Sequence, residues 1–147
     1  MDGSLWRTCR AAAHANAPLY PDVVPTLADL ARTGLALAVV SDADTEWLAA
    51  SVERNQLSID VILSSEDAGC YKPHQSLFRA GCERLGVSPA AAYVVDNPHL
   101  DVAGARNAGL TAIWLNRTGA DYPEDLQPPD HTITTLAELP ALLHVAR

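Results

Sequence analysis

The chain has 147 residues, a length that suits one domain with a single hydrophobic core. Its 48% apolar content is ordinary for a globular protein, and its net charge of −8 argues against nucleic acid, because phosphate backbones are bound by basic patches. No apolar run approaches the roughly 20 residues of a membrane span, and the N-terminus lacks the pattern of a secretory signal. We therefore expect neither a nucleic-acid nor a membrane partner.

The cysteines, Cys9, Cys70 and Cys82, are odd in number and include no close pair. None of them stands at zinc-ligand spacing with a histidine. Unpaired cysteines of this kind are typical of reduced thiols, so we predict a cytoplasmic protein.

The first 19 residues carry the weakest pattern of the chain. Residues 4–17 could form a helix, but its apolar face is thin and consists of Leu5, Cys9, Ala12 and Ala13. We predict that residues 1–19 form a helical capping segment or the remnant of one, and that residues 20–147 form the core domain.

From residue 22 onward, helical and strand patterns alternate. This alternation is typical of an α/β fold: a doubly wound, Rossmann-like parallel sheet with helices on both faces. Continuous apolar runs predict strands that are buried on both sides, at residues 35–40, 59–63, 92–95 and 111–115, with a short last strand near 132–134. Helical patterns start near Pro25 and Asp44 and cover residues 76–85, 100–108 and 136–145. Residues 117–130, with three prolines and a glycine, predict an irregular loop.

Three strand-end signals carry side chains suited to a phosphoryl group. Ser41 ends the first apolar run, Lys72 follows the second, and Asp96 ends the third, with Asp101 shortly after it. Because ligands bind at the carboxyl ends of the strands in such sheets, we expect these residues to meet at one edge. A hydroxyl, a lysine and two carboxylates are the parts needed to hold a phosphoryl group beside Mg²⁺.

Each of these residues also has a simpler structural explanation. Ser41 can merely end a strand and cap the next helix, although its hydroxyl and the following backbone N–H groups, including that of Asp42, can hold phosphate oxygens. Lys72 can be a solvated surface lysine, and Asp101 can cap the helix that follows it. If all these residues meet at one edge, that convergence supports the functional explanation more strongly than any single residue does.

In this order and spacing, the residues resemble the haloacid dehalogenase-like (HAD) superfamily, whose members are mostly Mg²⁺-dependent phosphatases. Residues 40–42 (Val-Ser-Asp) are similar to the second motif of the family, Lys72-Pro73 to the third, and residues 96–105 (Asp-Asn-Pro-His-Leu-Asp-Val-Ala-Gly-Ala) to the fourth. Val95 is a departure, because the family usually has glycine there. The resemblance spans about residues 20–118 and includes framework positions at residues 19–23 and 108–110.

The first motif of the family is a strand followed by Asp-x-Asp-Gly-Thr/Ser-Leu. Residues 1–6 (Met-Asp-Gly-Ser-Leu-Trp) resemble its tail, which places Asp2 in the acid/base position and the nucleophilic aspartate one residue before Met1. We therefore expect a truncation within the first motif. An in-frame apolar run ending in aspartate upstream of Met1 would support it, and a stop codon would refute a misassigned start. The alternative is a chance match of a short motif.

The resemblance implies a Mg²⁺-dependent, phosphatase-type hydrolase of a small phosphorylated metabolite, with little or no turnover while the nucleophile is absent. The alternative is a non-catalytic HAD-like module that retains a phosphate or metal site. Dehalogenation is disfavoured, because that branch works without metal and two carboxylates suit a cation. The implied roles are acid/base catalysis by Asp2, phosphoryl binding by Ser41, Asp42 and a catalytic Lys72, and metal binding by Asp96 and Asp101.

The absent strand would be the central one, flanked by the strands that end at Ser41 and Asp96. Buried ladder groups cannot stay unpaired, so those two strands must pair directly or a partner chain must fill the gap. We therefore expect a possible homodimer or strand exchange.

Overall fold

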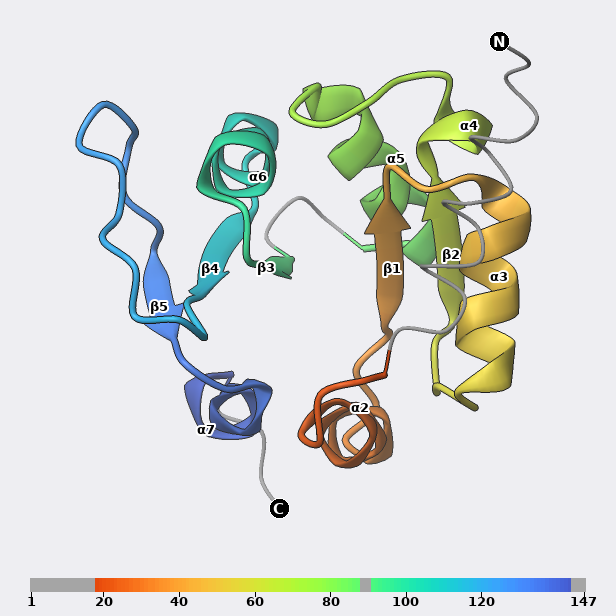
Figure 1. The fold of residues 1–147 in the computed structure, drawn as a ribbon. Coiled ribbons are helices and arrows are strands. Elements are labelled where there is room, and N and C mark those ends of the chain that lie inside the picture. The colour runs from red at the N-terminus through yellow and green to blue at the C-terminus, as the bar shows by residue number, and fades with distance from the viewer. Residues whose placement is uncertain (1–17, 88–90, 144–147) are drawn as a thin grey trace, which may run out of the picture.

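The computed structural model describes residues 18–87 and 91–143 (Figure 1). The predictions for Asp2 and for nearly all of the 1–19 segment lie outside these residues. Within them, no helix is long and apolar enough to cross a membrane.

Helices and strands alternate along the chain, and the predicted α/β class is confirmed. The helices are α2 (Val23–Arg32), α3 (Thr45–Arg54), α4 (Ser65–Ala68), α5 (Gln75–Leu85), α6 (Ala103–Ala108) and α7 (Leu139–Leu142), with a π-helical turn at Pro98–Val102 and a 3-10 turn at Leu136–Glu138. The strands are β1 (Ala38–Ser41), β2 (Val61–Ser64), β3 (Ala92–Val95), β4 (Thr111–Leu115) and β5 (His131–Ile133). The 117–130 segment between β4 and β5 is irregular, as predicted.

All strand pairings in the described residues are parallel, but they form two sheets instead of one. One sheet pairs β1 with β2, and the other has the order β3-β4-β5 (Figure 1). The strands that end at Ser41 and Asp96, β1 and β3, therefore face each other from separate sheets. Direct pairing between them, one of the two alternatives in our expectation, does not occur in this part of the chain.

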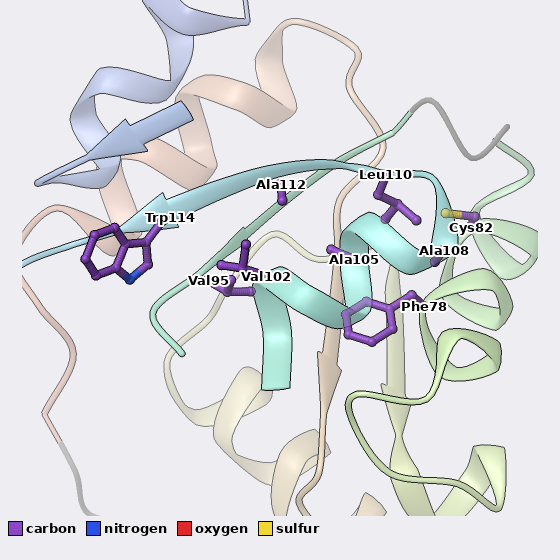
Figure 2. Packing of buried hydrophobic residues seen from close by; sticks show 9 residues of the cluster. All are labelled: Phe78, Cys82, Val95, Val102, Ala105, Ala108, Leu110, Ala112 and Trp114. Carbon is purple, nitrogen blue, oxygen red and sulfur yellow. The ribbon is translucent and has the colours of Figure 1, made fainter. Parts of the chain in front are cut away.

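The middle strand of the three-stranded sheet, β4, is buried on both faces, and its successive residues point to opposite sides. Ala112 and Trp114 join a core with α5 and α6 (Figure 2), whereas Ile113 joins a second core with α2 and α7. This is the pattern expected of a continuous apolar run in a sheet covered on both sides. On the other sheet, α3 packs on β2, and α5 packs on both β1 and β2.

Glycines end two of the helices that lead into strands. Gly86 and Gly109 adopt left-handed backbone angles, φ 68° and φ 87°, after α5 and α6. At the start of α6, the alternative in which Asp101 caps the helix is wrong. The side chain of Asn97 takes this role by accepting a hydrogen bond from Leu100 N (3.1 Å), and Asp101 lies inside the π-helical turn.

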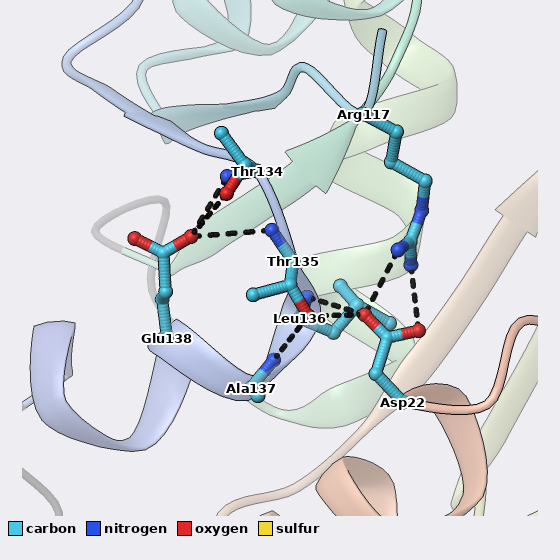
Figure 3. A network of polar contacts seen from close by, with 7 residues as sticks. All are labelled: Asp22, Arg117, Thr134, Thr135, Leu136, Ala137 and Glu138. Atoms are coloured by element: carbon cyan, nitrogen blue, oxygen red, sulfur yellow. Dashed lines mark hydrogen bonds and ion pairs between the residues drawn. The ribbon is translucent and has the colours of Figure 1, made fainter.

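Asp22, at one of the framework positions of the resemblance, joins three distant segments. Its carboxylate accepts two hydrogen bonds from the guanidinium of Arg117, both 2.9 Å long, one from Thr135 Oγ1 (2.6 Å) and one from Leu136 N (2.8 Å) (Figure 3). The Arg117 hydrogen bonds, with help from Thr135 and Leu136, hold the pKa of Asp22 well below its usual value. Arg117 also stacks on Tyr20, 4.1 Å from the ring centroid, so this network fixes the start of α2 against the chain after β4.

Candidate active site

The strands that carry the predicted site residues end at the gap between the two sheets. Ser41 is the last residue of β1, and Asp96 directly follows β3. Lys72 lies in the loop between α4 and α5, next to a cis Lys72–Pro73 peptide bond. The loop is held to the end of β1 by Asp42, whose Oδ1 accepts a hydrogen bond from Lys72 N (3.1 Å).

An ion pair between Lys72 and Asp101 forms the centre of the site. The Lys72 Nζ lies 2.6 Å from Asp101 Oδ1, and the two side chains are only 12% and 9% exposed. Burial raises the pKa of Asp101, while Lys72 opposes this by stabilising the carboxylate, and the nearby charge of Asp96 adds to the rise. The simple explanation of Lys72 as a solvated surface lysine is therefore wrong.

Tyr93 is a member of this cluster that sequence reasoning missed. Its hydroxyl lies 3.3 Å from Val40 O on β1 and 3.4 Å from Asp101 Oδ1, so it can donate to either. The Lys72 ammonium lies 5.7 Å from the centroid of its ring, and Phe78 packs edge-on against the ring at 4.9 Å. A hydroxyl in an otherwise apolar buried strand was the available signal, since a buried tyrosine usually has a polar partner.

Burial and the neighbouring carboxylates, of which Asp101 is the first, hold the pKa of Tyr93 far above its usual value. The phenol is therefore neutral and serves as a hydrogen-bond donor at any physiological pH. In this form its single proton can be donated either to the Asp101 carboxylate or to the Val40 carbonyl.

The hydroxyl of Ser41 is engaged locally. Its Oγ accepts a hydrogen bond from Ala43 N (3.2 Å), a turn-stabilising bond that agrees with the structural explanation. The same atom still carries a proton that it can donate to a phosphate oxygen. The simple and the functional explanations of Ser41 are therefore compatible.

Asp96 is exposed, and its position is fixed through the backbone. Its carbonyl oxygen accepts a hydrogen bond from Trp114 Nε1 (3.1 Å), which ties the end of β3 to β4. Val95, where the resemblance shows glycine, is buried in the core with Trp114 and Val102, so its side chain is accommodated by the α6 side of the sheet.

The oxygen ligands present are those that Mg²⁺ prefers. Mg²⁺ is usually held by one or two carboxylates, with waters and substrate oxygens completing its shell. In residues 18–87 and 91–143, no group of three or more His, Cys, Asp or Glu side chains is placed to hold a metal. The Asp96 carboxylate is exposed, and its charge is near enough to Asp101 to contribute to the raised pKa of that carboxyl.

Residues 3–115 match the family described as haloacid dehalogenase-like hydrolase. The chain belongs to this family. Among curated HAD relatives, it is 31% identical over 134 residues to (S)-2-haloacid dehalogenase 4A of Burkholderia cepacia, covering 90% of this chain and 58% of the relative. It is 40% identical over 128 residues to phosphoserine phosphatase of Thermus thermophilus, covering 83% of this chain and 50% of the relative.

Solved HAD structures give the same result for the fold. The crystal structure of a HAD phosphatase from Thermococcus onnurineus superposes with a TM-score of 0.83 at 32% identity, covering 97% of this chain and 66% of that chain. The α/β HAD-like fold is thereby confirmed. The chain spans about half the length of the curated relatives it matches.

Proposed function

We propose that this HAD-family hydrolase acts as a Mg²⁺-dependent phosphatase on a small phosphorylated molecule. The observation that carries the proposal is the buried ion pair between Lys72, in the loop before α5, and Asp101, in the turn that follows β3. A buried ammonium held against a carboxylate, with a hydroxyl and a second carboxylate on the strand ends around it, is suited to bind an anionic group and a cation together.

Ser41 and Lys72 bind the phosphoryl oxygens in this mechanism. The Ser41 hydroxyl donates to one oxygen, and the backbone N–H groups after it, including that of Asp42, lie in the turn before α3. The ammonium of Lys72 neutralises negative charge that develops during transfer. Asp42 positions Lys72 through the 3.1 Å bond to its backbone N–H.

Asp96 and Asp101 would hold Mg²⁺. A bound cation offsets the negative charge of the phosphoryl oxygens, which is its usual contribution to phosphoryl transfer. Lys72 and Tyr93 hold the Asp101 carboxylate in place for this role.

The remaining chemistry depends on residues outside those described. A carboxylate nucleophile attacks phosphorus to give an aspartyl-phosphate, the leaving alcohol takes a proton from Asp2, and water then hydrolyses the acyl phosphate. The family match includes Gly3-Ser4-Leu5, which supports the assignment of Asp2-Gly3-Ser4-Leu5 to the first motif. With the attacking aspartate absent from residues 1–147, we expect little or no turnover by the chain alone.

The test is to extend the chain at its N-terminus by a short apolar strand that ends in aspartate one residue before Met1. The extended protein should hydrolyse an aryl phosphate with Mg²⁺, and the matched extension that ends in asparagine should not. Lys72→Met in the active extension should abolish turnover. A folded extension with aspartate that gives no turnover with Mg²⁺ would contradict the proposal.

Dehalogenation is a second candidate, and the comparisons strengthen it beyond our sequence-based expectation. Several relatives are (S)-2-haloacid dehalogenases, with 30% and 31% identity over most of this chain. The Lys72–Asp101 pair also fits this chemistry, because the ammonium balances the carboxylate by itself. In that reaction, the aspartate displaces halide from C2 and water hydrolyses the resulting ester. Chloride release from 2-chloropropionate by the extended protein in EDTA would identify this activity.

A non-catalytic HAD-like module remains an alternative if Mg²⁺ or phosphate raises the melting temperature while the extended protein shows no turnover.

We further propose a cytoplasmic location, which the free thiols of Cys70 and Cys82 support. The possible homodimer is tested by light scattering, where a strictly monomeric species would contradict it.

A further inference from the structure

The carboxylate of Asp42 carries a negative charge that its contact with Lys72 does not require. The residue directly follows β1, its side chain is exposed, and its Oδ1 accepts a hydrogen bond from Lys72 N (3.1 Å). A neutral amide oxygen could also accept this bond, because the donor is a backbone N–H. The charge of Asp42 can therefore serve a different purpose.

Three carboxylates act on the region around the hydroxyl of Tyr93. Asp101 Oδ1 lies 3.4 Å from this hydroxyl, and Val40 O, two residues before Asp42, lies 3.3 Å from it. Burial raises the pKa of the Tyr93 phenol most, and the negative charges of Asp101, Asp42 and Asp96 add to the rise. The three carboxylates therefore lie near one another, where β1 and β3 end.

A single ammonium offsets these charges in the part of the chain that the structure describes. Lys72 Nζ lies 2.6 Å from Asp101 Oδ1, and no other ion pair among the described residues includes any of the three carboxylates. Three carboxylates against one ammonium leave an excess of two negative charges. Because Asp101 already holds the ammonium, an incoming anion must compete with this carboxylate for Lys72.

An anion that enters this site alone meets different electrostatic conditions from one that enters with a divalent cation. A carboxylate without a cation adds a further negative charge to the excess. A phosphoryl group accompanied by Mg²⁺ adds little net charge, and the cation also offsets the carboxylates around it. Asp96 has the proposed role of holding that cation, so the charge of Asp42 is the one left to discriminate between anions.

We propose that the Asp42 carboxylate determines which anions the site accepts. It repels carboxylate substrates that arrive without a cation, such as 2-haloacids, and it tolerates a phosphoryl group whose charge is offset by a divalent cation. This inference rests on the proposed function and specifies its substrate class as phosphate monoesters, at the expense of dehalogenation.

The test compares the whole chain with its Asp42→Asn variant as binders of (S)-2-chloropropionate in EDTA. Asparagine keeps an oxygen for Lys72 N and replaces the other carboxylate oxygen by an N–H donor. Backbone amide shifts of Ser41, Ala43 and Lys72 in NMR titrations report binding at the site. At about 10 mM ionic strength, where charges interact over about 30 Å, the variant should bind about tenfold more tightly.

Two control variants separate the charge of Asp42 from its structural contact. Asp44→Asn removes the same charge two residues further along, where the side chain makes no cap hydrogen bond, and should raise the affinity less than about threefold. Asp42→Glu keeps the charge and should bind no more tightly than the unsubstituted chain. At about 1 M salt, where the screening length is about 3 Å, the advantage of Asp42→Asn should largely disappear.

Equal affinities of the unsubstituted chain and Asp42→Asn, including no detectable binding by either, would overturn the inference. An equal gain in Asp44→Asn, any gain in Asp42→Glu, or a gain that persists at high salt would also overturn it, because the selection would then not depend on the charge of Asp42.

Phosphate binding to the unsubstituted chain with Mg²⁺, measured on the same amides, tests the proposed function separately. Its absence would contradict the proposed function itself. A chain that binds phosphate with Mg²⁺, and that binds 2-chloropropionate equally well before and after Asp42→Asn, would contradict this inference alone.

Discussion

The ammonium of Lys72 lies 2.6 Å from Asp101 Oδ1, although the two residues come from the loop before α5 and the turn before α6. Both side chains are largely buried, so each charge is stabilised by the opposite charge of the other. A buried ion pair of this kind is weak evidence for stability as a whole, but the loss of one partner leaves an uncompensated charge. The pair therefore links the chemistry of the site to the stability of the fold.

We expect Lys72→Met to lower the free energy of unfolding by about 3 kcal/mol, because it leaves the Asp101 carboxylate buried without its cation. Urea unfolding at pH 7 measures this change. The control is Arg32→Ala, which removes an exposed ion pair with Asp29 and should cost less than about 1 kcal/mol. The double variant Lys72→Met/Asp101→Leu should recover part of the loss; an equal or greater loss would contradict the coupling.

Tyr93→Phe should lower the free energy of unfolding by about 1 kcal/mol, since it removes a hydroxyl shared between Val40 O and Asp101. The ring and its contact with Phe78 remain, so the core should stay intact. The Tyr93 hydrogen bond favours the ionised carboxylate, so its loss should raise the pKa of Asp101 further. An NMR titration of the Asp101 carboxyl carbon checks the second effect. An unchanged or lower pKa would rule out this role of the hydroxyl.

Gly104→Ala should destabilise the protein by about 1–3 kcal/mol, the usual cost of overpacking a core. A Cβ at this position would overlap the ring of Phe78 and come within 3.0 Å of Pro73 O, in the loop that carries Lys72. Helix propensity alone would favour alanine by about 1 kcal/mol. A stabilised variant would therefore show that Phe78 and Pro73 can move away from the added Cβ at little cost. Gly104→Ala/Phe78→Leu should recover much of the loss. Thermal unfolding of the two variants provides the comparison.

Asp22 should make stability depend on pH in the acid range. Its pKa is lowered in the folded protein, so its contribution is fully present well above the ordinary aspartate value of about 3.9 and is lost as pH falls toward the folded pKa. As the pH falls below about 5, the melting temperature of the unsubstituted chain should therefore decrease. Asp22→Asn should lower stability at pH 7 and make the melting temperature depend less on pH. Arg117→Met should weaken the same pH dependence. A slope unchanged by either substitution would count against the network.

Inorganic phosphate with Mg²⁺ should raise the melting temperature of the chain even without turnover, because a ligand that binds only the folded state stabilises it. Asp96→Asn should remove most of the Mg²⁺-dependent part of this shift. Asp96 is exposed, and the bond that holds it to Trp114 uses its backbone carbonyl, so the substitution should leave stability without ligand nearly unchanged. A Mg²⁺ effect that survives in Asp96→Asn would place the cation elsewhere.

Local features of the sequence were sufficient to predict most of the secondary structure. Apolar runs located β1, β2, β3 and β4, and Gly86 and Gly109 located two helix ends, because strand burial and left-handed caps depend on residues close together in the chain. The helix predicted from residue 100 was less accurate, since the π-helical turn before α6 depends on Asn97 and on packing around Val102.

The place of the candidate site residues at or after strand ends also predicted that they lie at a common edge, because parallel strands have their carboxyl ends on the same side. Only the tertiary structure decided that Lys72 pairs with Asp101, that Tyr93 reaches Val40, and that Gly104 lies against Phe78. It also decided that β1 and β3 stand in separate sheets. These contacts join residues distant in sequence, and their formation depends on how the helices and strands pack, for which neighbouring residues give no signal.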